Sequence, residues 1–412
     1  MRDGKIAAVL PAAAARERFP DAEELALDHH VLIPGLVNTH THAAMSLMRG
    51  LADDLPLMRW LEEHIWPAEA KHVSAEFVRD GTLLACAEML RGGITCFNDM
   101  YFYPEASLEA ALACGMRSAQ GIIAIEFPSA YAADAADYLR KGLAVRDRHR
   151  EQPLASFCLA PHAPYTVSDE TLRKIATLAA ELDLPVCIHL HETLDEISRS
   201  VAEHGVRPIA RLQRLGLLGP GLIAVHAVHL EAAEIDLHAR HGCSVAHCPS
   251  SNLKLASGFA PVDALLKKGV NVALGTDGAA SNNRLDLFQE MRTAALLAKA
   301  VAGDSQALGA AQALRAATLA GARALGIDAI AGSIEPGKAA DLVALELRSP
   351  ELVPCYDVVS QLVYSAGREH VTHVWVAGRR LVRDGILEIP ALDGLNTRLE
   401  LWQNALKKHA EA

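Results

Sequence analysis

The middle of the chain repeats one pattern of apolar and polar positions: an amphipathic helical stretch, a glycine or proline, and a short apolar segment. Copies of it occupy residues 84–97, 108–122, 175–190, 211–226, 235–248 and 263–276. The short segments are continuously apolar, which is typical of strands buried on both faces in parallel sheets with helical crossovers. A glycine after the last helical turn suits a left-handed C-cap. The pattern therefore predicts a series of βα units.

Two further apolar segments, residues 31–38 and 153–161, bring the predicted strands to eight. Eight successive βα units predict an α/β fold and favour a closed (β/α)8 barrel of the TIM type over an open, doubly wound sheet. The length of 412 residues suits such a barrel with a small accessory domain.

After Gly337 the pattern becomes β-rich, in residues 341–347 and 370–385, with Gly378 placed as a hairpin turn. We expect these segments and a short N-terminal strand at residues 6–10 to form a small β-sandwich accessory domain. The expected domains are the N-terminal part of this unit (1–32), the barrel (33–335), the C-terminal part of the unit (336–390) and a C-terminal helix (391–412).

Composition narrows the class of protein. The formal net charge is −11 and no cluster of lysine and arginine is visible, which argues against a nucleic-acid partner. No apolar segment approaches the roughly 20 residues that a membrane span needs. The eight cysteines lie mostly in apolar segments without a C-x-x-C pair, and residues 3–5 form a turn where a signal peptide would need an apolar run. We therefore expect a cytoplasmic protein with reduced thiols.

Candidate chemical groups follow the predicted strands, where barrel enzymes build their active sites. His40 and His42 are two residues apart and can present two imidazoles to one cation. His189 and Glu192 have opposite strand parity, so both can face the site only if the chain leaves the strand near residue 190. His191 shares the parity of His189, and the spacing leaves open which of the two binds a metal.

Two other strand ends carry His226 and Asp277. Taken alone, an aspartate beside glycine is commonly a turn residue, and a single histidine is commonly structural. Four separate strand ends that each deliver a metal-compatible or proton-transfer group are typical of an active site. The convergence predicts a metal-dependent enzyme, since a non-catalytic metal-binding paralogue would have lost one of these groups.

The segments PGLVNTHTH, APHAPYTVS, HLHET, VHAVHL, HCPSSNLKLASGFAPV and LGTDGAASNN resemble the 5′-methylthioadenosine/S-adenosylhomocysteine deaminase branch of the amidohydrolase superfamily. The resemblance covers residues 31 to about 385 and implies hydrolytic deamination of a 6-aminopurine nucleoside. Triazine hydrolases are also similar, so a triazine or other aminoheterocycle hydrolase is the alternative. The resemblance implies His40, His42, His189 and Asp277 as metal ligands and leaves His191 as a bystander.

Three nitrogens and one carboxylate suit a zinc ion, and ferrous iron also fits. Relatives with two metals use a carboxylated lysine on the fourth strand, whereas this chain has no lysine between Lys141 and Lys174, so we expect one metal. The resemblance implies that Asp277 accepts a proton from the attacking water and that His226 orients this water. Glu192 would protonate the purine ring and then the departing amine.

The resemblance also implies that Glu69, which reaches the ribose hydroxyls, His162 and Glu192 bind the substrate. Family members that bind the amino-acid tail of S-adenosylhomocysteine place arginines after the third strand, whereas residues 121–135 here read GIIAIEFPSAYAADA. We therefore favour 5′-methylthioadenosine, with adenosine and S-adenosylhomocysteine as further candidates. Relatives also carry a longer segment before residue 3, so we expect either an incomplete small β unit or a true start of the chain upstream. We expect a homo-oligomer, either a dimer or a tetramer.

Overall fold

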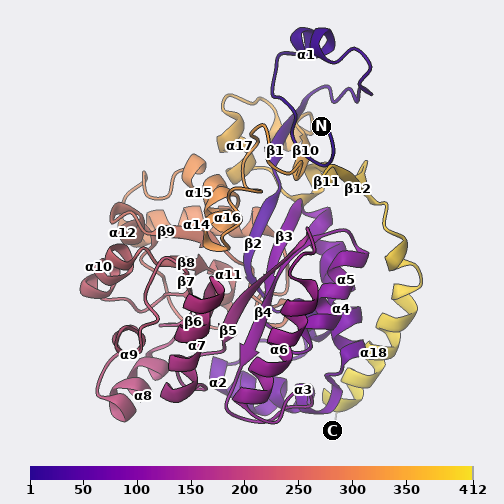
Figure 1. Cartoon of the computed structure of the whole chain (residues 1–412). Helices are drawn as coiled ribbons and strands as arrows, with labels where there is room; N and C mark the ends of the chain where they lie inside the picture. Colours follow the sequence, from indigo (N-terminus) through magenta and orange to yellow (C-terminus); the bar gives the residue numbers. More distant parts are fainter. Residues whose placement is uncertain (411–412) are drawn as a thin grey trace.

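The structure, a computed structural model, describes residues 1–410 and centres on a parallel eight-stranded sheet surrounded by helices (Figure 1). The strands follow one another in chain order around the sheet: β2 (Leu36–Thr41), β3 (Ile94–Asp99), β4 (Arg117–Ala124), β5 (Ala155–Pro161), β6 (Val186–Leu190), β7 (Leu222–His226), β8 (Ser244–His247) and β9 (Asn271–Leu274). Nearly all their residues are buried, as continuously apolar segments require. The predicted (β/α)8 architecture is confirmed.

Within residues 1–410, no backbone ladder joins the first barrel strand, β2, to the last, β9. Individual hydrogen bonds connect them instead. The Thr39 hydroxyl donates to the Leu274 carbonyl over 2.6 Å, and the Asn38 amide donates to the Thr276 hydroxyl over 2.7 Å. The backbone N–H of Asp277 donates to the carbonyl of His40 over 3.0 Å. Closure of the barrel therefore brings the ends of β2 and β9 together.

Capping residues mark the beginnings and ends of several helices around the barrel. They are α4 (Ala75–Arg91), α5 (Pro104–Ala113), α6 (Ala135–His149), α7 (Asp169–Leu182), α8 (Leu194–His204), α9 (Pro208–Arg214), α10 (Ala232–His241), α11 (Pro249–Lys254), α12 (Val262–Lys267), α13 (Ala279–Asn282), α14 (Leu287–Ala302), α15 (Ala310–Ala316) and α16 (Leu319–Ala324). Side chains of Ser168 and Thr193 cap α7 and α8 by accepting a backbone N–H. Gly205, Gly242 and Gly303 end α8, α10 and α14 in the left-handed conformation, and Gly242 is the glycine stop of the predicted repeat over residues 235–248.

The small β unit is one antiparallel sheet, whereas the sequence suggested a two-sheet sandwich. Its strands, in sheet order, are β1 (His30–Pro34), β10 (Leu342–Glu346), β11 (Val371–Val376), β12 (Arg379–Arg383) and β13 (Ile386–Leu387). Ala377 and Gly378 both have positive φ, at 46° and 76°, which is the geometry of a tight hairpin turn between β11 and β12. The turn predicted at Gly378 is therefore present.

Two local expectations were wrong. The strand predicted at residues 6–10 is absent; Lys5 forms only an isolated bridge to Ala339, and a helix, α1 (Ala12–Arg18), follows. The single barrel strand predicted over residues 31–38 is divided between β1 and β2 at Gly35. A Cβ atom on Gly35 would lie 2.0 Å from the Thr95 hydroxyl, so glycine permits the close backbone approach at this junction.

Additional segments cover the site end of the barrel and its flank. Between β2 and α4 the chain forms η1 (Ala43–Met48), α2 (Leu57–Trp60), the π-helical turn η2 (Leu61–Ile65) and α3 (Trp66–His72), which we call the lid segment. The C-terminal helix α18 (Leu395–Ala410) runs along the flank beside α4 (Figure 1), where Asp80 accepts from Arg398 over 2.8 Å and from Trp402 over 3.0 Å. The helix expected over residues 391–412 thus begins at Leu395, and residues 411–412 lie outside the described residues.

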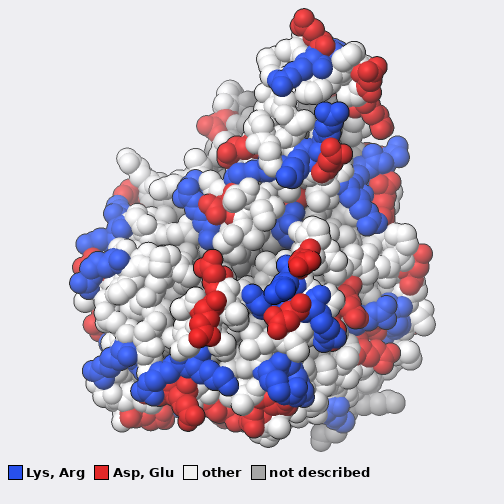
Figure 2. Space-filling model, in the orientation of Figure 1, with Lys and Arg blue, Asp and Glu red and all other residues white. Residues whose placement is uncertain are grey.

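Three of the remaining elements lie between β10 and β11 in the chain: η3 (Pro350–Leu352), α17 (Val358–Tyr364) and η4 (Arg368–His370). The fourth, η5 (Pro390–Leu392), follows β13. On the face shown in Figure 2, lysine and arginine side chains alternate with aspartate and glutamate. Within the part of the chain that the structure describes, no helix has both the length and the apolar character to cross a bilayer.

Candidate active site

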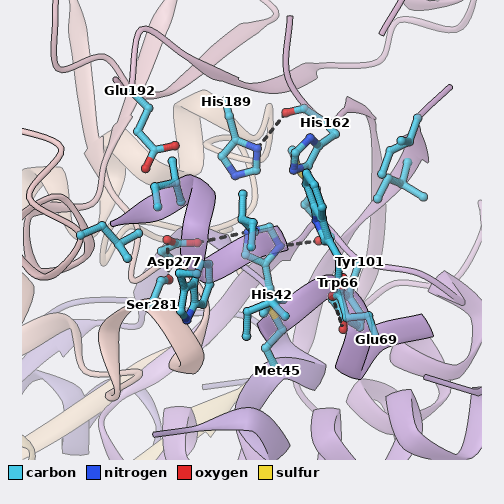
Figure 3. A pocket seen from close by; sticks show the side chains of 18 of the residues that line it. His42, Met45, Trp66, Glu69, Tyr101, His162, His189, Glu192, Asp277 and Ser281 are labelled. Atoms are coloured by element: carbon cyan, nitrogen blue, oxygen red, sulfur yellow. Dashed lines mark hydrogen bonds and ion pairs between the residues drawn. The ribbon is translucent and has the colours of Figure 1, made fainter. Parts of the chain in front are cut away.

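Four side chains with metal-ligating atoms converge at the carboxyl ends of the barrel strands. His40 and His42 come from the end of β2, His189 from β6, and Asp277 from the turn after β9. One ligand atom from each lies within 4.8 Å of the corresponding atom of every other. Figure 3 shows His42, His189 and Asp277 facing the centre of the pocket. The structure thus brings together the four ligands expected from the resemblance.

Hydrogen bonds orient two of the imidazoles so that Nε2 points into the site. Nδ1 of His42 donates to the Met100 carbonyl over 2.6 Å, and Nδ1 of His189 donates to the His162 carbonyl over 2.8 Å. Nε2 of His189 then lies 3.1 Å from Nε2 of His40. Two nitrogen lone pairs that face each other at this distance repel unless both interact with a shared proton or cation. This donor set fits a divalent metal ion, with the Nδ1 contacts fixing the tautomers.

The charge states of three of the four ligands suit a metal. The exception is His42: burial lowers its pKa, but the hydrogen bond to Asp277 and the charge of that carboxylate raise it to about 9, so a metal ion would have to displace a proton from this ring. Burial lowers the pKa of His40 to about 4 and lowers the pKa of His189 well below its usual value. Burial opposes ionisation of Asp277, but hydrogen bonds from His40 and His42 hold its pKa well below the usual range. Neutral imidazoles and an ionised carboxylate are the forms that coordinate a metal.

The Asp277 carboxylate is fixed by two serines that the sequence analysis did not assign. Its Oδ2 accepts from the Ser251 hydroxyl over 2.7 Å and from the Ser281 hydroxyl over 2.6 Å. Its Oδ1 faces the histidines and lies 3.1 Å from Nε2 of His42. One oxygen is therefore occupied by the protein, and the other faces the proposed ligand cluster.

Glu192 and His226 face each other beside the four ligands. Glu192 Oε2 lies 3.7 Å from His226 Nε2, and Glu192 Oε1 accepts from the Ser257 hydroxyl over 3.2 Å. Nδ1 of His226 donates to the Asn252 side-chain oxygen over 2.8 Å, which directs Nε2 toward the site. Burial raises the pKa of Glu192 above its usual value, as a proton-shuttling carboxyl requires.

The backbone at the end of β6 explains how His189 and Glu192 share one site. Strand β6 ends at Leu190, and His191 adopts a left-handed φ of 56°, so the strand alternation stops before Glu192. The His191 ring is buried away from the ligand cluster. Its Nδ1 donates to the His229 carbonyl and its Nε2 accepts the Ile209 N–H, both over 3.1 Å. Because both of its ring nitrogens are engaged, His191 is structural.

Above the ligand cluster lies a pocket with a largely apolar wall. The lid segment and the ends of β3 and β4 supply most of this wall: Leu57, Trp60, Leu61, Ile65, Trp66, Phe102, Ile123, Ile125 and Phe127. None of the described side chains that line the pocket is lysine or arginine. The sequence analysis did not assign these lid residues, since their apolar pattern also suits a helix that packs in the core.

Glu69 and His162 both line the pocket (Figure 3). Glu69 Oε1 accepts from the Tyr101 hydroxyl over 2.7 Å, and burial raises the pKa of Glu69 to about 7. The His162 ring contacts the Thr166 hydroxyl through Nδ1 at 2.9 Å, and burial lowers its pKa to about 3. Both side chains are therefore within the pocket, where a substrate could reach them.

Comparison with known proteins places this site among nucleoside deaminases. The profile of the amidohydrolase family matches residues 31–381. A 5-methylthioadenosine/S-adenosylhomocysteine deaminase of Saccharophagus degradans is 48% identical over 403 residues, which cover 98% of this chain and 90% of the relative. A 5′-deoxyadenosine deaminase of Methanothermobacter thermautotrophicus is 48% identical over 362 residues, with 87% and 83% covered.

The same similarity extends to a solved structure. The crystal structure of an adenosine deaminase from Xanthomonas campestris with bound zinc has a TM-score of 0.97 and 51% sequence identity to this chain. The match covers 98% of this chain and 92% of that chain, and therefore includes the barrel and the small sheet.

Proposed function

The chain belongs to the amidohydrolase family, and we propose that it is a zinc-dependent hydrolase that deaminates 6-aminopurine nucleosides, with 5′-methylthioadenosine preferred. The observation that carries this proposal is the cluster of four ligand atoms within 4.8 Å beneath a pocket that also holds Glu192 and His226. The similar proteins are named for adenosine, 5′-deoxyadenosine, 5-methylthioadenosine and S-adenosylhomocysteine. These nucleosides share an adenine base and differ in the group at the 5′ position.

His40, His42, His189 and Asp277 would hold one zinc ion, the metal bound in the similar adenosine deaminase. When bound in such a site, zinc supplies an activated water near neutral pH. A second metal has no bridging lysine available, because β5 ends in Ala160 and Pro161.

In the proposed reaction the water oxygen adds to carbon 6 of the purine, and ammonia then leaves. Asp277 takes the proton that the water loses, while Nε2 of His226 hydrogen-bonds the water and directs it to the ring. Glu192 donates its proton to ring nitrogen 1, takes up the proton that remains on the added oxygen, and passes it to the amino group as the carbon–nitrogen bond breaks. The proton held by Asp277 then returns to Glu192. The raised pKa of Glu192 favours this role because the carboxyl holds a proton more readily. The products are a 6-oxopurine nucleoside and ammonia.

We assign the ribose hydroxyls to Glu69 and a second contact with the nucleoside to His162. A carboxylate that lines an apolar pocket and already accepts from Tyr101 can accept further hydroxyl donors. A ribose offers such donors and a triazine ring does not. Glu69 therefore favours a nucleoside over the alternative triazine substrate.

The pocket continues into a second cavity of about 310 Å³ that suits an uncharged 5′ group. Trp66, Glu69, Phe102 and Phe127 line both cavities, and the second adds residues up to Tyr131. None of the described residues that line it is basic. A methylthio group would contact apolar side chains there, whereas the carboxylate of S-adenosylhomocysteine would approach the carboxyl of Glu69 without a cationic partner.

The proposal is tested by following the purine absorption band after purified, zinc-loaded protein is mixed with nucleosides and, separately, with chloro- and amino-triazines. We expect turnover of 5′-methylthioadenosine with stoichiometric ammonia, slower turnover of S-adenosylhomocysteine, and none of the triazines. Failure to release ammonia from any 6-aminopurine nucleoside by protein with a full metal content would refute the proposed function. A clear preference for S-adenosylhomocysteine would refute only the assignment of the 5′ subsite.

We further propose a cytoplasmic location and a dimeric or tetrameric assembly. The location is supported by the cysteines, since those that the structure describes are all free thiols and only Cys355 is exposed. Cell fractionation and light scattering of the purified protein test these two proposals.

A further inference from the structure

A buried carboxylate on α14 connects two short helices that flank the site. Glu290 is 1% exposed and does not line the substrate pocket. Its Oε2 accepts the backbone N–H of Ser250, in the first turn of α11, over 3.1 Å. Its Oε1 accepts from the Asn282 amide, in the last turn of α13, over 2.9 Å.

The neighbours of these contacts hold the proposed catalytic groups. Ser251 follows Ser250 and donates to the Asp277 carboxylate over 2.7 Å. Ser281 precedes Asn282 and donates to the same carboxylate oxygen over 2.6 Å.

The same two segments reach further into the site. Asn252, the next residue of α11, accepts from Nδ1 of His226 over 2.8 Å. The Asn282 amide also donates to the carbonyl of Thr276, the residue before Asp277, over 2.7 Å. The residues that Glu290 contacts are thus one or two positions from the side chains that orient Asp277 and His226.

We propose that Glu290 is a positioning residue that sets the orientation of the Asp277 carboxylate and the His226 ring by holding α11 and α13 together. The inference rests on the proposed metal site but not on the identity of the substrate. Helices α11 and α13 have only six and four residues, so few helical hydrogen bonds of their own fix their positions.

The chemistry of the contacts requires a carboxylate at position 290. Both oxygens of Glu290 face N–H donors, so a glutamine would turn its NH2 group toward a donor in either orientation. Either Ser250 or Asn282 would then lose its acceptor and move. Because Ser251 and Ser281 bond the same oxygen of Asp277, movement of one of them changes the orientation of the carboxylate.

The test compares wild-type protein with Glu290→Gln and with a matched control, Asp341→Asn. Asp341 is also a buried carboxylate, accepting from Arg117 over 2.9 Å and from the Ala377 N–H over 2.7 Å, but it lies at the opposite end of the barrel. The readouts are the visible spectrum of the Co2+-substituted protein, the rate at which a chelator removes Zn2+, and the melting temperature.

We expect Glu290→Gln to alter the Co2+ bands and to weaken metal retention by about 10-fold or more, as loss of groups that orient metal ligands typically does. Asp341→Asn should lower the melting temperature while leaving the Co2+ spectrum and the chelation rate unchanged. If Glu290→Gln fails to fold, Glu290→Asp, which keeps the carboxylate but shortens its reach to Ser250 and Asn282, carries the same expectation for metal retention.

Coupling provides a second check. Ser281→Ala should weaken metal retention less in the Glu290→Gln background than in the wild type, because both changes disturb the same carboxylate. A Glu290→Gln protein with wild-type Co2+ bands and chelation rate would overturn the inference, as would full additivity with Ser281→Ala. Wild-type protein that retains metal but deaminates no nucleoside would refute the proposed function without touching this inference.

Discussion

Replacing Glu69 with glutamine should weaken nucleoside binding and stabilise the fold at the same time. The change removes the charge but keeps the shape, and a glutamine carbonyl can still accept from the Tyr101 hydroxyl. The proposed contact with the ribose would lose a charged acceptor. Hydrogen bonds to charged groups contribute about 1.5–3 kcal/mol, so we expect KM for 5′-methylthioadenosine to rise about 10- to 100-fold, with a smaller change in kcat.

The effect on stability follows from the pKa of Glu69. Burial raises it from 4.5 to about 7 in the folded protein. Below pH 4.5 the carboxyl is protonated in both folded and unfolded chains and has no effect. Between pH 4.5 and 7 the carboxyl ionises in the unfolded chain but keeps its proton in the folded one. The free energy of unfolding of the wild-type protein therefore falls by up to about 3 kcal/mol relative to the glutamine variant as the pH rises through this range. Glu69 is only half-buried and lines an open pocket, so screening reduces the expected difference to about 1–2 kcal/mol.

Urea unfolding of both proteins at pH 4.5 and pH 8, with the same metal loading, measures this difference. Steady-state kinetics with 5′-methylthioadenosine and with its 2′,3′-dideoxy analogue measure the ribose contact. The wild type should discriminate strongly between the two nucleosides and the variant should not. Equal KM values for the wild type and the variant on the ribonucleoside would refute the assignment of Glu69 to the ribose. A stability difference independent of pH would refute the reasoning from its pKa.

Three other changes test the site. Glu192→Gln should lower kcat by roughly 10²- to 10⁴-fold with full metal content, and near-normal turnover would exclude Glu192 as the proton shuttle. Ala130→Arg, which places a cation beside the second cavity, should raise kcat/KM for S-adenosylhomocysteine relative to 5′-methylthioadenosine, and an unchanged ratio would argue that the tail lies elsewhere. Removal of the metal by a chelator should abolish activity and lower the melting temperature, because Zn2+ at 100 times its Kd stabilises the folded state by about 2.7 kcal/mol; restoration by zinc is the control.

Much of the barrel could be predicted because its signals are local. A strand buried on both faces must be continuously apolar, and a helix that ends in a left-handed residue favours glycine, so β6 to β9 and the end of α10 follow from the sequence. His40 and His42 followed from strand parity in the same way. The assignments of Glu69 and His162 required the family resemblance, since neither follows a spacing rule.

The remaining features depend on contacts between distant segments. Pro34 and Gly35 interrupt the apolar segment from residue 31 to 38, but they do not reveal that the chain changes sheets there, because that break reflects the approach of Thr95. The choice between His189 and His191 depends on a left-handed backbone angle at His191. Ser251 and Ser281 carry no periodic signal, because nothing in the sequence distinguishes a serine of a short helix whose hydroxyl donates to Asp277 from one that does not.

The way in which the barrel closes has a consequence for metal loading during synthesis. The ligands His40 and Asp277 lie on either side of the junction between the first and last barrel strands. Among the described residues, individual hydrogen bonds from side chains and loops connect the two strands there, without a backbone ladder. A bound metal ion would add a further link across that junction. The growing polypeptide cannot assemble all four ligands until residue 277 has left the ribosome. In a cell deprived of zinc, the junction between β2 and β9 should therefore separate more readily, and the chain should be cleaved more rapidly by proteases.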